Sequence, residues 1–207
     1  MNSTKGMYVK LGSILIASIA SLVIVACGSG GGQTIPSDQA LKPVKGESGW
    51  RTNDNGGVTI TVPTDWEKTG PIDAKPGRLY AFQTAENSFG TRGGAQLITL
   101  EKRKQSAEKM VKALGDEAVA IAGAKEISTK PVKWPGATSA WFLTYVAYPP
   151  SNGEVAPHPT EVLVVDFKNG GQAQATVTAL REDFAPQEMH KVLGTVTITD
   201  KVGAKSS

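Results

Sequence analysis

The chain has 207 residues, a formal net charge of +3 and a 40% share of hydrophobic residues. Two lysines lie in a leader at the N-terminus, so the rest of the chain is almost neutral and its basic residues are scattered. Such a distribution argues against nucleic-acid binding, which depends on a basic surface. The single cysteine excludes a disulfide within the chain, so stability must come from a packed core.

Residues 1–26 have the organisation of an export signal. Lys5 and Lys10 precede an uncharged, largely apolar run over residues 11–25, which leads directly into Cys27. This order is typical of a cleaved secretory signal, and it resembles the lipobox of bacterial lipoproteins. In that family the cysteine receives a diacylglycerol and becomes the first residue of the mature chain. We therefore expect a signal peptide over residues 1–26 and lipid attachment at Cys27, on the extracytoplasmic face of the cell membrane.

Two other interpretations of this segment remain open, an ordinary signal peptide with an incidental cysteine and an uncleaved membrane helix. A membrane-spanning helix needs about 20 apolar residues, whereas this run is shorter and contains one glycine and three serines. A glycine-rich tract over residues 28–32 follows it. The start of translation, Met1 or Met7, also stays open.

The next segment, residues 27–49, is rich in Gly, Ser, Gln, Lys and Pro and is predicted to be a flexible, lipidated tether. A coil of this length and composition has a span on the order of 25 Å. A single domain is expected over residues 50–199, because the remaining length suits one core better than two. Residues 200–207 are polar and predict a disordered tail.

The first half of the domain predicts three strands and a helix. Residues 58–62 alternate apolar and polar, as in a half-buried strand, and further strands are expected over residues 79–84 and 95–101. A turn is predicted at residues 53–57, because the acidic spacing of a calcium loop is missing. The helix covers residues 106–121, with Ser106 as N-cap and Gly123 as its end. Its expected buried stripe is Ala107, Met110, Val111, Leu114, Ala118 and Ile121.

The second half predicts four strands, at residues 126–132, 138–148, 161–168 and 172–180. Pro135-Gly136 suits a type II turn and Asn169-Gly170 a type I′ hairpin. Strand 138–148 is apolar on both faces, so both sides of the sheet should be covered there. A second helix from Pro186 and a closing strand over residues 195–199 complete the pattern.

This order predicts an α+β sandwich: a twisted antiparallel sheet of about six to eight strands, covered by two main helices. The strand Val58–Val62 runs into Pro63 and Trp66, and a helix, a Pro-Gly turn and an Asn-Gly hairpin follow. In these features, over residues 50–198, the chain resembles actinobacterial LpqN-type lipoproteins, whose domain is similar to the photosystem protein PsbP. The resemblance implies a PsbP-like sandwich and an accessory role in the cell envelope, with envelope proteins or glycolipids as partners.

Candidate catalytic groups are few. His158 and His190 have no carboxylate at ligand spacing, and a zinc site needs three or four ligands. No Gly-x-Ser-x-Gly elbow is present, and nothing in the sequence brings Glu86 and Asp166 together as a carboxylate pair. We therefore expect neither catalysis nor a metal or other cofactor.

The function favoured by these observations is a non-catalytic binding module on a lipid anchor. Trp134 and Trp66 are the candidate binding surface, because amphipathic rings are enriched in binding hot spots. Packing of Trp134 over the end of the sheet is the competing interpretation. A structural spacer and an envelope hydrolase with an unrecognised site remain as alternative functions.

Overall fold

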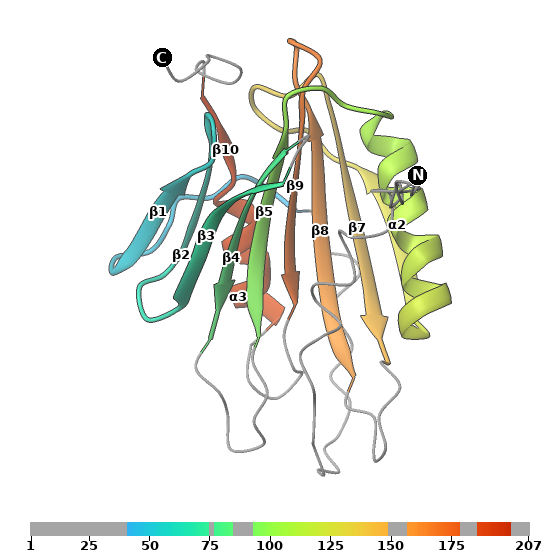
Figure 1. Cartoon of the computed structure of the whole chain (residues 1–207). Coiled ribbons are helices and arrows are strands. Elements are labelled where there is room, and N and C mark those ends of the chain that lie inside the picture. Colours follow the sequence, from blue (N-terminus) through green and yellow to red (C-terminus); the bar gives the residue numbers. More distant parts are fainter. Residues whose placement is uncertain (1–40, 75–76, 85–92, 149–156, 179–185, 200–207) are drawn as a thin grey trace, which may run out of the picture.

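The computed structural model describes residues 41–74, 77–84, 93–148, 157–178 and 186–199. Figure 1 shows a sheet of long strands with helices packed against it. The strands before the first described helix are β1 (Trp50–Asp54), β2 (Val58–Pro63), β3 (Glu67–Ala74), β4 (Gly77–Gln83) and β5 (Gly94–Leu100). They are followed by α2 (Ala107–Ala122), β6 (Lys125–Pro131), β7 (Ser139–Ala147), β8 (His158–Asp166), β9 (Gln172–Thr178), α3 (Pro186–Gly194) and β10 (Thr197–Ile198).

The strands form two antiparallel sheets. The large sheet has seven strands in the order β3-β4-β5-β9-β8-β7-β6, and the small sheet has the order β1-β2-β10. Every described strand pair is antiparallel, as expected for strands joined mostly by short connections. The predicted α+β sandwich is confirmed, and the small sheet is an addition that the sequence did not predict.

The two described helices cover opposite faces of the large sheet. Helix α2 packs on β6, β7 and β8, whereas α3 packs on β8, β9 and β2, and in Figure 1 α3 lies behind the strands. Strand β7 contributes to both cores, because Leu143 packs with α2 and Phe142 with the cluster that contains α3. The expectation that both faces of this strand are covered is confirmed.

Local sequence signals fix α2 much as expected. The Ser106 side chain accepts a hydrogen bond from the Lys109 N–H at 3.4 Å, and Gly123 ends the helix in the left-handed region at φ 57°. The Lys112 ammonium lies 2.8 Å from the Glu108 carboxylate. One member of the predicted buried stripe is wrong, because Ile121 is 49% exposed.

The other face carries the larger core. Ala173, Ala175 and Val177 of β9 are buried there with Met189 and Leu193 of α3. Small side chains on β9 let the helix approach the sheet closely, as the sequence predicted. Three strand residues of β2, which are Val58, Ile60 and Val62, complete this core and are fully buried.

Both predicted turns are present, but one has a different type. Gly136 has φ 78° and the Ala137 N–H donates to the Trp134 carbonyl at 3.2 Å, as in a type II turn. At the β8–β9 hairpin the positive φ belongs to Gly170, at 88°. Among the described residues the only non-glycine with positive φ is Glu126, so Asn169 lacks the left-handed conformation of a type I′ turn. The Asn169 side chain instead accepts the Gly171 N–H at 3.0 Å.

Strands β1 and β3 were missed in the sequence because both lack an apolar alternation. Strand β1 lies at the edge of the small sheet, and its one buried residue is the polar Asn53. Strand β3 lies at the edge of the large sheet and contains Gly70-Pro71, where its register against β4 shifts. Proline is tolerated at an edge because no neighbour needs its missing N–H.

The domain begins earlier than Trp50. Leu41 is 3% exposed and belongs to the larger core, and the Val44 N–H donates to the Gly194 carbonyl at 2.9 Å. Residues 41–49, predicted as part of the flexible tether, therefore pack on the domain, and the predicted boundary needs this correction. Residues 1–40 and 200–207 lie outside the described residues. None of the described helices is long and apolar enough to cross a membrane.

Replacing Asn55 tests the joint between the two sheets. Asn55 is fully buried, and its side-chain amide donates to the carbonyls of Arg78 at 2.9 Å and Leu97 at 3.1 Å. Asn55→Ala leaves two carbonyls without this donor and should lower the free energy of unfolding by about 2 kcal/mol in urea titrations. Asn169→Ala, at an exposed turn, should cost less than about 1 kcal/mol. Equal losses in the two variants would contradict this role for Asn55.

Candidate functional site

The two tryptophans predicted as a binding surface are part of the core. Trp134 is 6% exposed, and its indole N–H donates to the Val196 carbonyl at 3.0 Å. Trp66 is 4% exposed, and its carbonyl accepts a hydrogen bond from Arg51. The hydrogen bond to Val196 satisfies the indole N–H of Trp134. Because both rings are buried, neither is exposed to contact a partner. The expectation of a tryptophan binding surface is therefore corrected, and the competing interpretation of Trp134 as a packed ring holds.

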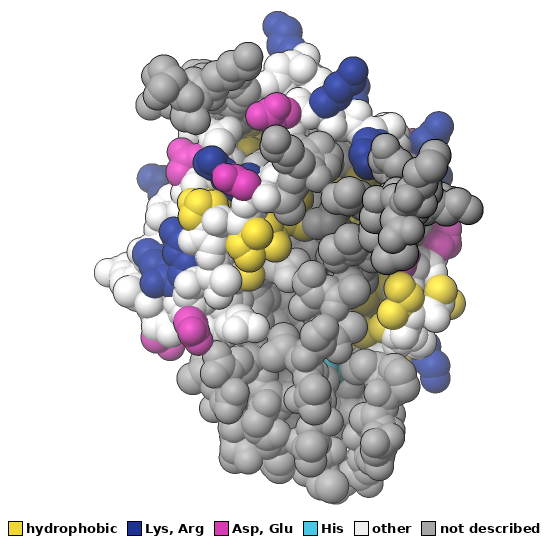
Figure 2. Space-filling model, in the orientation of Figure 1, with side chains coloured by type: hydrophobic (Ala, Val, Ile, Leu, Met, Phe, Trp, Pro, Cys, Tyr) yellow, Lys and Arg dark blue, Asp and Glu magenta, His cyan; other side chains and the backbone are white. Residues whose placement is uncertain are grey.

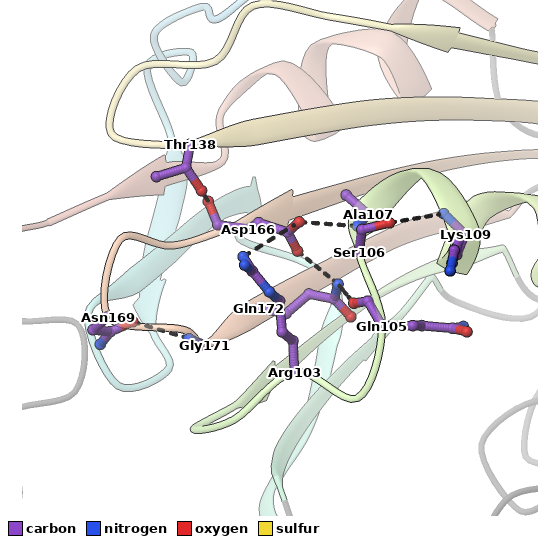
Figure 3. Close-up of polar contacts among 10 residues, drawn as sticks. All are labelled: Arg103, Gln105, Ser106, Ala107, Lys109, Thr138, Asp166, Asn169, Gly171 and Gln172. Atoms are coloured by element: carbon purple, nitrogen blue, oxygen red, sulfur yellow. Dashed lines mark hydrogen bonds and ion pairs between the residues drawn. The ribbon is translucent and has the colours of Figure 1, made fainter.

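A polar cluster around Asp166 anchors the start of α2 (Figure 3). One carboxylate oxygen accepts the Ala107 N–H at 3.0 Å and lies 3.5 Å from the Arg103 guanidinium. The other accepts the Gln172 amide at 2.7 Å, and the same amide donates to the Gln105 carbonyl at 3.0 Å. A buried carboxylate at a helix N-terminus stabilises the helix through its dipole and its free N–H groups. All of these contacts are internal, so the Asp166 cluster is structural.

A second buried carboxylate pairs with a histidine on the α3 face. Glu161 is 1% exposed, and the Nδ1 atom of His190 lies 2.9 Å from each of its carboxylate oxygens. The edge of the His190 ring meets Phe142, with 5.6 Å between ring centroids. Its Nε2 atom is buried and has no hydrogen-bond partner among the described residues. The pair fixes α3 against β8.

A third polar group lies on the α2 face, at the end of the sheet where β7 stops and β8 begins. Tyr145 pairs with Thr160 across the β7–β8 ladder, and Thr160 pairs with Thr178 across the β8–β9 ladder. The hydroxyl oxygens of the two threonines are 3.1 Å apart. Paired residues share a face, so the three side chains form one row.

Two titratable residues join this row, and together the five residues are the sheet-end cluster: Glu117, Tyr145, His158, Thr160 and Thr178. Glu117 comes from α2, and burial raises its pKa. The pKa of the Tyr145 phenol is raised, first by burial and also by the Glu117 charge, while a hydrogen bond with Thr160 lowers it. His158 lies two residues before Thr160 on the same face, and burial lowers its pKa from 6.5 to about 4.

At neutral pH the sheet-end cluster offers hydrogen bonding by four uncharged groups beside one carboxylate, Glu117, whose charge helps to raise the pKa of Tyr145. The phenol, the imidazole and the two hydroxyls are all neutral there, because burial moves the pKa of Tyr145 up and that of His158 down. A general base works best with a pKa close to the operating pH. Burial instead moves the pKa of His158 away from neutral pH, to about 4. The cluster is therefore suited to holding a polar group rather than to moving its proton.

Sequence reasoning named His158 and His190 but missed both of their surroundings. Glu161 and His190 are 29 residues apart, and Thr178 joins Thr160 only through the β8–β9 pairing. The sequence does hold one signal for these surroundings: side chains alternate between the two faces along β8, so Thr160 and Glu161 lie on opposite faces. The described residues contain no group of three or more metal-ligating side chains. Cys27 and Glu86 lie outside the described residues.

No family model and no curated protein matches the chain. Among solved structures, it is similar to LpqN of Mycobacterium tuberculosis, described as involved in cell envelope biogenesis. The TM-score is 0.47 at 16% identity, covering 76% of this chain and 90% of that one. A Bacteroides thetaiotaomicron protein matches with a TM-score of 0.40 at 13% identity, covering 70% of this chain and 46% of that one. Likenesses of this size carry no argument about family, activity or partners, so membership of the LpqN group stays a prediction.

The pKa of His158 predicts a loss of stability in acid. In the unfolded chain His158 takes up a proton near pH 6.5, but in the folded protein only near pH 4. Between these values the unfolded state binds more protons, so lowering the pH from 7 to 4 should cost up to about 3 kcal/mol through this residue. Urea titrations at both pH values, with wild type and His158→Gln, measure this difference. An identical pH dependence in the two proteins would contradict the assignment.

Breaking the Glu161–His190 pair should be costly. His190→Ala leaves a buried carboxylate without its partner, and losses of about 3 kcal/mol are typical of such changes. Lys191→Ala is the matched control one residue away, because its contact with Glu47 is exposed and should contribute little. Thermal and urea unfolding of both variants measure the difference. A His190→Ala protein as stable as the control would show that the pair does not hold α3.

Proposed function

We propose that the chain is a lipid-anchored protein of the cell envelope, whose α+β domain is a non-catalytic binding module outside the cytoplasm. The observation that carries the anchor is the sequence of the leader: a basic start, an apolar run over residues 11–25 and Cys27 directly after it. Lipid attachment at Cys27 would leave the domain attached to the membrane through the residues that precede Leu41.

The length of this link sets how closely the domain is held. From Cys27 to Leu41 there are 14 residues, rich in glycine and serine. A flexible chain of this length has a span on the order of 20 Å, shorter than the span expected when the domain was placed at Trp50. The domain would therefore lie close to the lipid surface and meet membrane-bound partners there.

The sheet-end cluster is the candidate binding site in this proposal. It replaces Trp134 and Trp66, which are both buried, because four of its five residues are half-buried and only Thr160 is buried. Its neutral hydroxyl, phenol and imidazole groups would hydrogen-bond a polar group of an envelope protein or a glycolipid. The same neutrality supports binding over catalysis, because His158 is a poor proton acceptor near pH 7.

Replacing the cysteine tests the anchor. Cys27→Ser removes the thiol that would carry the diacylglycerol, so this variant should leave the membrane fraction, whereas wild type should stay there after high-salt and carbonate washes. Ser29→Cys/Cys27→Ser, which moves the thiol two residues away, is the matched control and should also be released. Full retention of Cys27→Ser in washed membranes would contradict lipid anchoring.

Removing one hydroxyl tests the binding site. Thr178→Val keeps the shape of the side chain but loses the hydroxyl that lies 3.1 Å from that of Thr160, and Thr178→Ser keeps the hydroxyl. Proteins and lipids that co-purify from native membranes in mild detergent should be identified by mass spectrometry for all three chains. A partner lost in Thr178→Val and retained in Thr178→Ser supports the site. The same partner at equal levels in all three would place binding elsewhere, and no partner at all would favour a structural spacer.

A further inference from the structure

Basic residues that are scattered in the sequence meet at one end of the fold. Three connections lie at this end: residues 101–106 between β5 and α2, residues 132–138 between β6 and β7, and residues 167–171 between β8 and β9. The Arg103 N–H donates to the Gly170 carbonyl at 2.9 Å, and the Thr138 N–H donates to the Asp166 carbonyl at 2.9 Å. The three connections are therefore neighbours, at the upper end of the strands in Figure 1.

Together these three connections form the loop-end surface, which is basic. Its charged residues are five basic ones and a single acidic one: Lys102, Arg103, Lys104, Lys133, Lys168 and Glu101. All six are exposed, and Figure 2 shows Lys and Arg side chains at the same upper end. Arg103 lies 3.5 Å from the buried carboxylate of Asp166, whereas the four lysines form no ion pair among the described residues. Because the chain beyond residue 26 is almost neutral, this excess of positive charge is a product of the fold.

The chain enters the domain beside the loop-end surface. Trp134, in the connection between β6 and β7, donates its indole N–H to the Val196 carbonyl at 3.0 Å, which holds the end of α3 there. The Val44 N–H donates to the carbonyl of the last residue of α3 at 2.9 Å. Lys42 and Lys45, on either side of Val44, are exposed. They extend the positive charge toward the point where the described domain begins.

The length of the proposed link places this end of the domain nearest to the membrane. Strand β8 begins at the sheet-end cluster and ends beside the loop-end surface, and its nine residues span about 26 Å. The 14 residues from Cys27 to Leu41 have a coil span on the order of 20 Å. To bring the sheet-end cluster to the lipid, the link would have to run back along most of the domain. The loop-end surface reaches the lipid without such stretching.

We propose that the loop-end surface lies against anionic phospholipid headgroups of the membrane that holds the anchor. This orientation rests on the lipid anchor of the proposed function. Each lysine close to an anionic lipid surface strengthens binding about fivefold. An acidic protein would meet the same charge, but the anchor keeps the lipid surface within reach at all times, which favours the lipid. The sheet-end cluster is then turned away from the lipid, so a partner that binds there approaches from the envelope side.

Vesicle binding tests the surface without the anchor. The chain from residue 27 with Cys27→Ser carries no lipid of its own. It should bind vesicles that contain phosphatidylglycerol more tightly than vesicles of phosphatidylcholine alone. High salt should remove this difference, because it screens the attraction between exposed charges. Equal binding to the two kinds of vesicle would overturn the proposal.

Charge reversal locates the contact on the domain. In the same unanchored chain, Lys102→Glu/Lys168→Glu should weaken binding to the phosphatidylglycerol vesicles about 25-fold or more, since two lysines are lost from the contact. Lys68→Glu/Lys125→Glu is the matched control, because it has the same net charge but its lysines are exposed near the other end of the large sheet. It should weaken binding less than about fivefold. Melting temperatures check that each variant folds.

Two results of this comparison would overturn the proposal. One is an equal loss of binding in the two variants, which would make the attraction a matter of net charge alone. The other is a wild-type chain that binds neither kind of vesicle, together with a protein that co-purifies from native membranes and is lost in Lys102→Glu/Lys168→Glu. That result would assign the loop-end surface to an acidic protein.

Labels in the anchored protein test the orientation. Lipid attachment blocks the thiol of Cys27, so Lys168→Cys and Lys125→Cys each offer one thiol for a fluorescent label. Vesicles with a spin label on the headgroup should quench the fluorescence at position 168 and leave that at position 125 unchanged. Protein that floats with the vesicles but is quenched equally at both positions would contradict the orientation and leave the anchor intact. Protein that does not float would instead contradict the anchor, which distinguishes the two failures.

Discussion

The structure depends on one constraint: the middle of the large sheet is apolar on both faces. Leu143, Val162 and Val164 point to one side, and Phe142, Leu163 and Val165 to the other, and all six are at most 2% exposed. Burying a side chain of this size stabilises the fold by about 1.5–3 kcal/mol relative to leaving it in water. Both faces of β7 and β8 must therefore be covered, by α2 on one side and by α3 with β2 on the other.

This constraint decides where polar groups stand. Those within the covered area need internal partners, because an unpaired buried charge is costly. Asp166 meets the start of α2, and Glu161 meets His190 on α3. At the end of the sheet Thr160 is buried, whereas the other four residues of the sheet-end cluster are half-buried. The proposed binding site lies there, rather than at the paired carboxylates.

The sequence predicted what depends on neighbouring residues. The cap of α2 at Ser106 and its end at Gly123 are local signals, and the two-faced composition of β7 is visible in its own residues. Predictions failed where a distant partner decides the outcome. Trp134 packs in the larger core, where the Val196 carbonyl, 62 residues later, accepts its N–H. The position of the β8–β9 hairpin was predictable but its turn type was not, because the Asn169 side chain bonds the Gly171 N–H.

The candidate site was harder to predict than the fold for the same reason. Thr160 and Thr178 are unremarkable strand residues in the sequence, and pairing of β8 with β9 brings their hydroxyls together. His158 carries no local sign of a shifted pKa, because its burial comes from the packing of the folded domain. The proposed anchor at Cys27 is the opposite case, because it rests on sequence order alone.

A binding domain on a lipid anchor is the central proposal, and the covalent state of Cys27 tests it most directly. Intact-mass and N-terminal peptide mass spectrometry of wild-type protein, extracted in detergent from its native membrane, measures that state. We expect a chain that begins at Cys27 and is heavier than its peptide by a diacylglyceryl group. A chain that retains residues 1–26, or one cut elsewhere with a free thiol at Cys27, would contradict it.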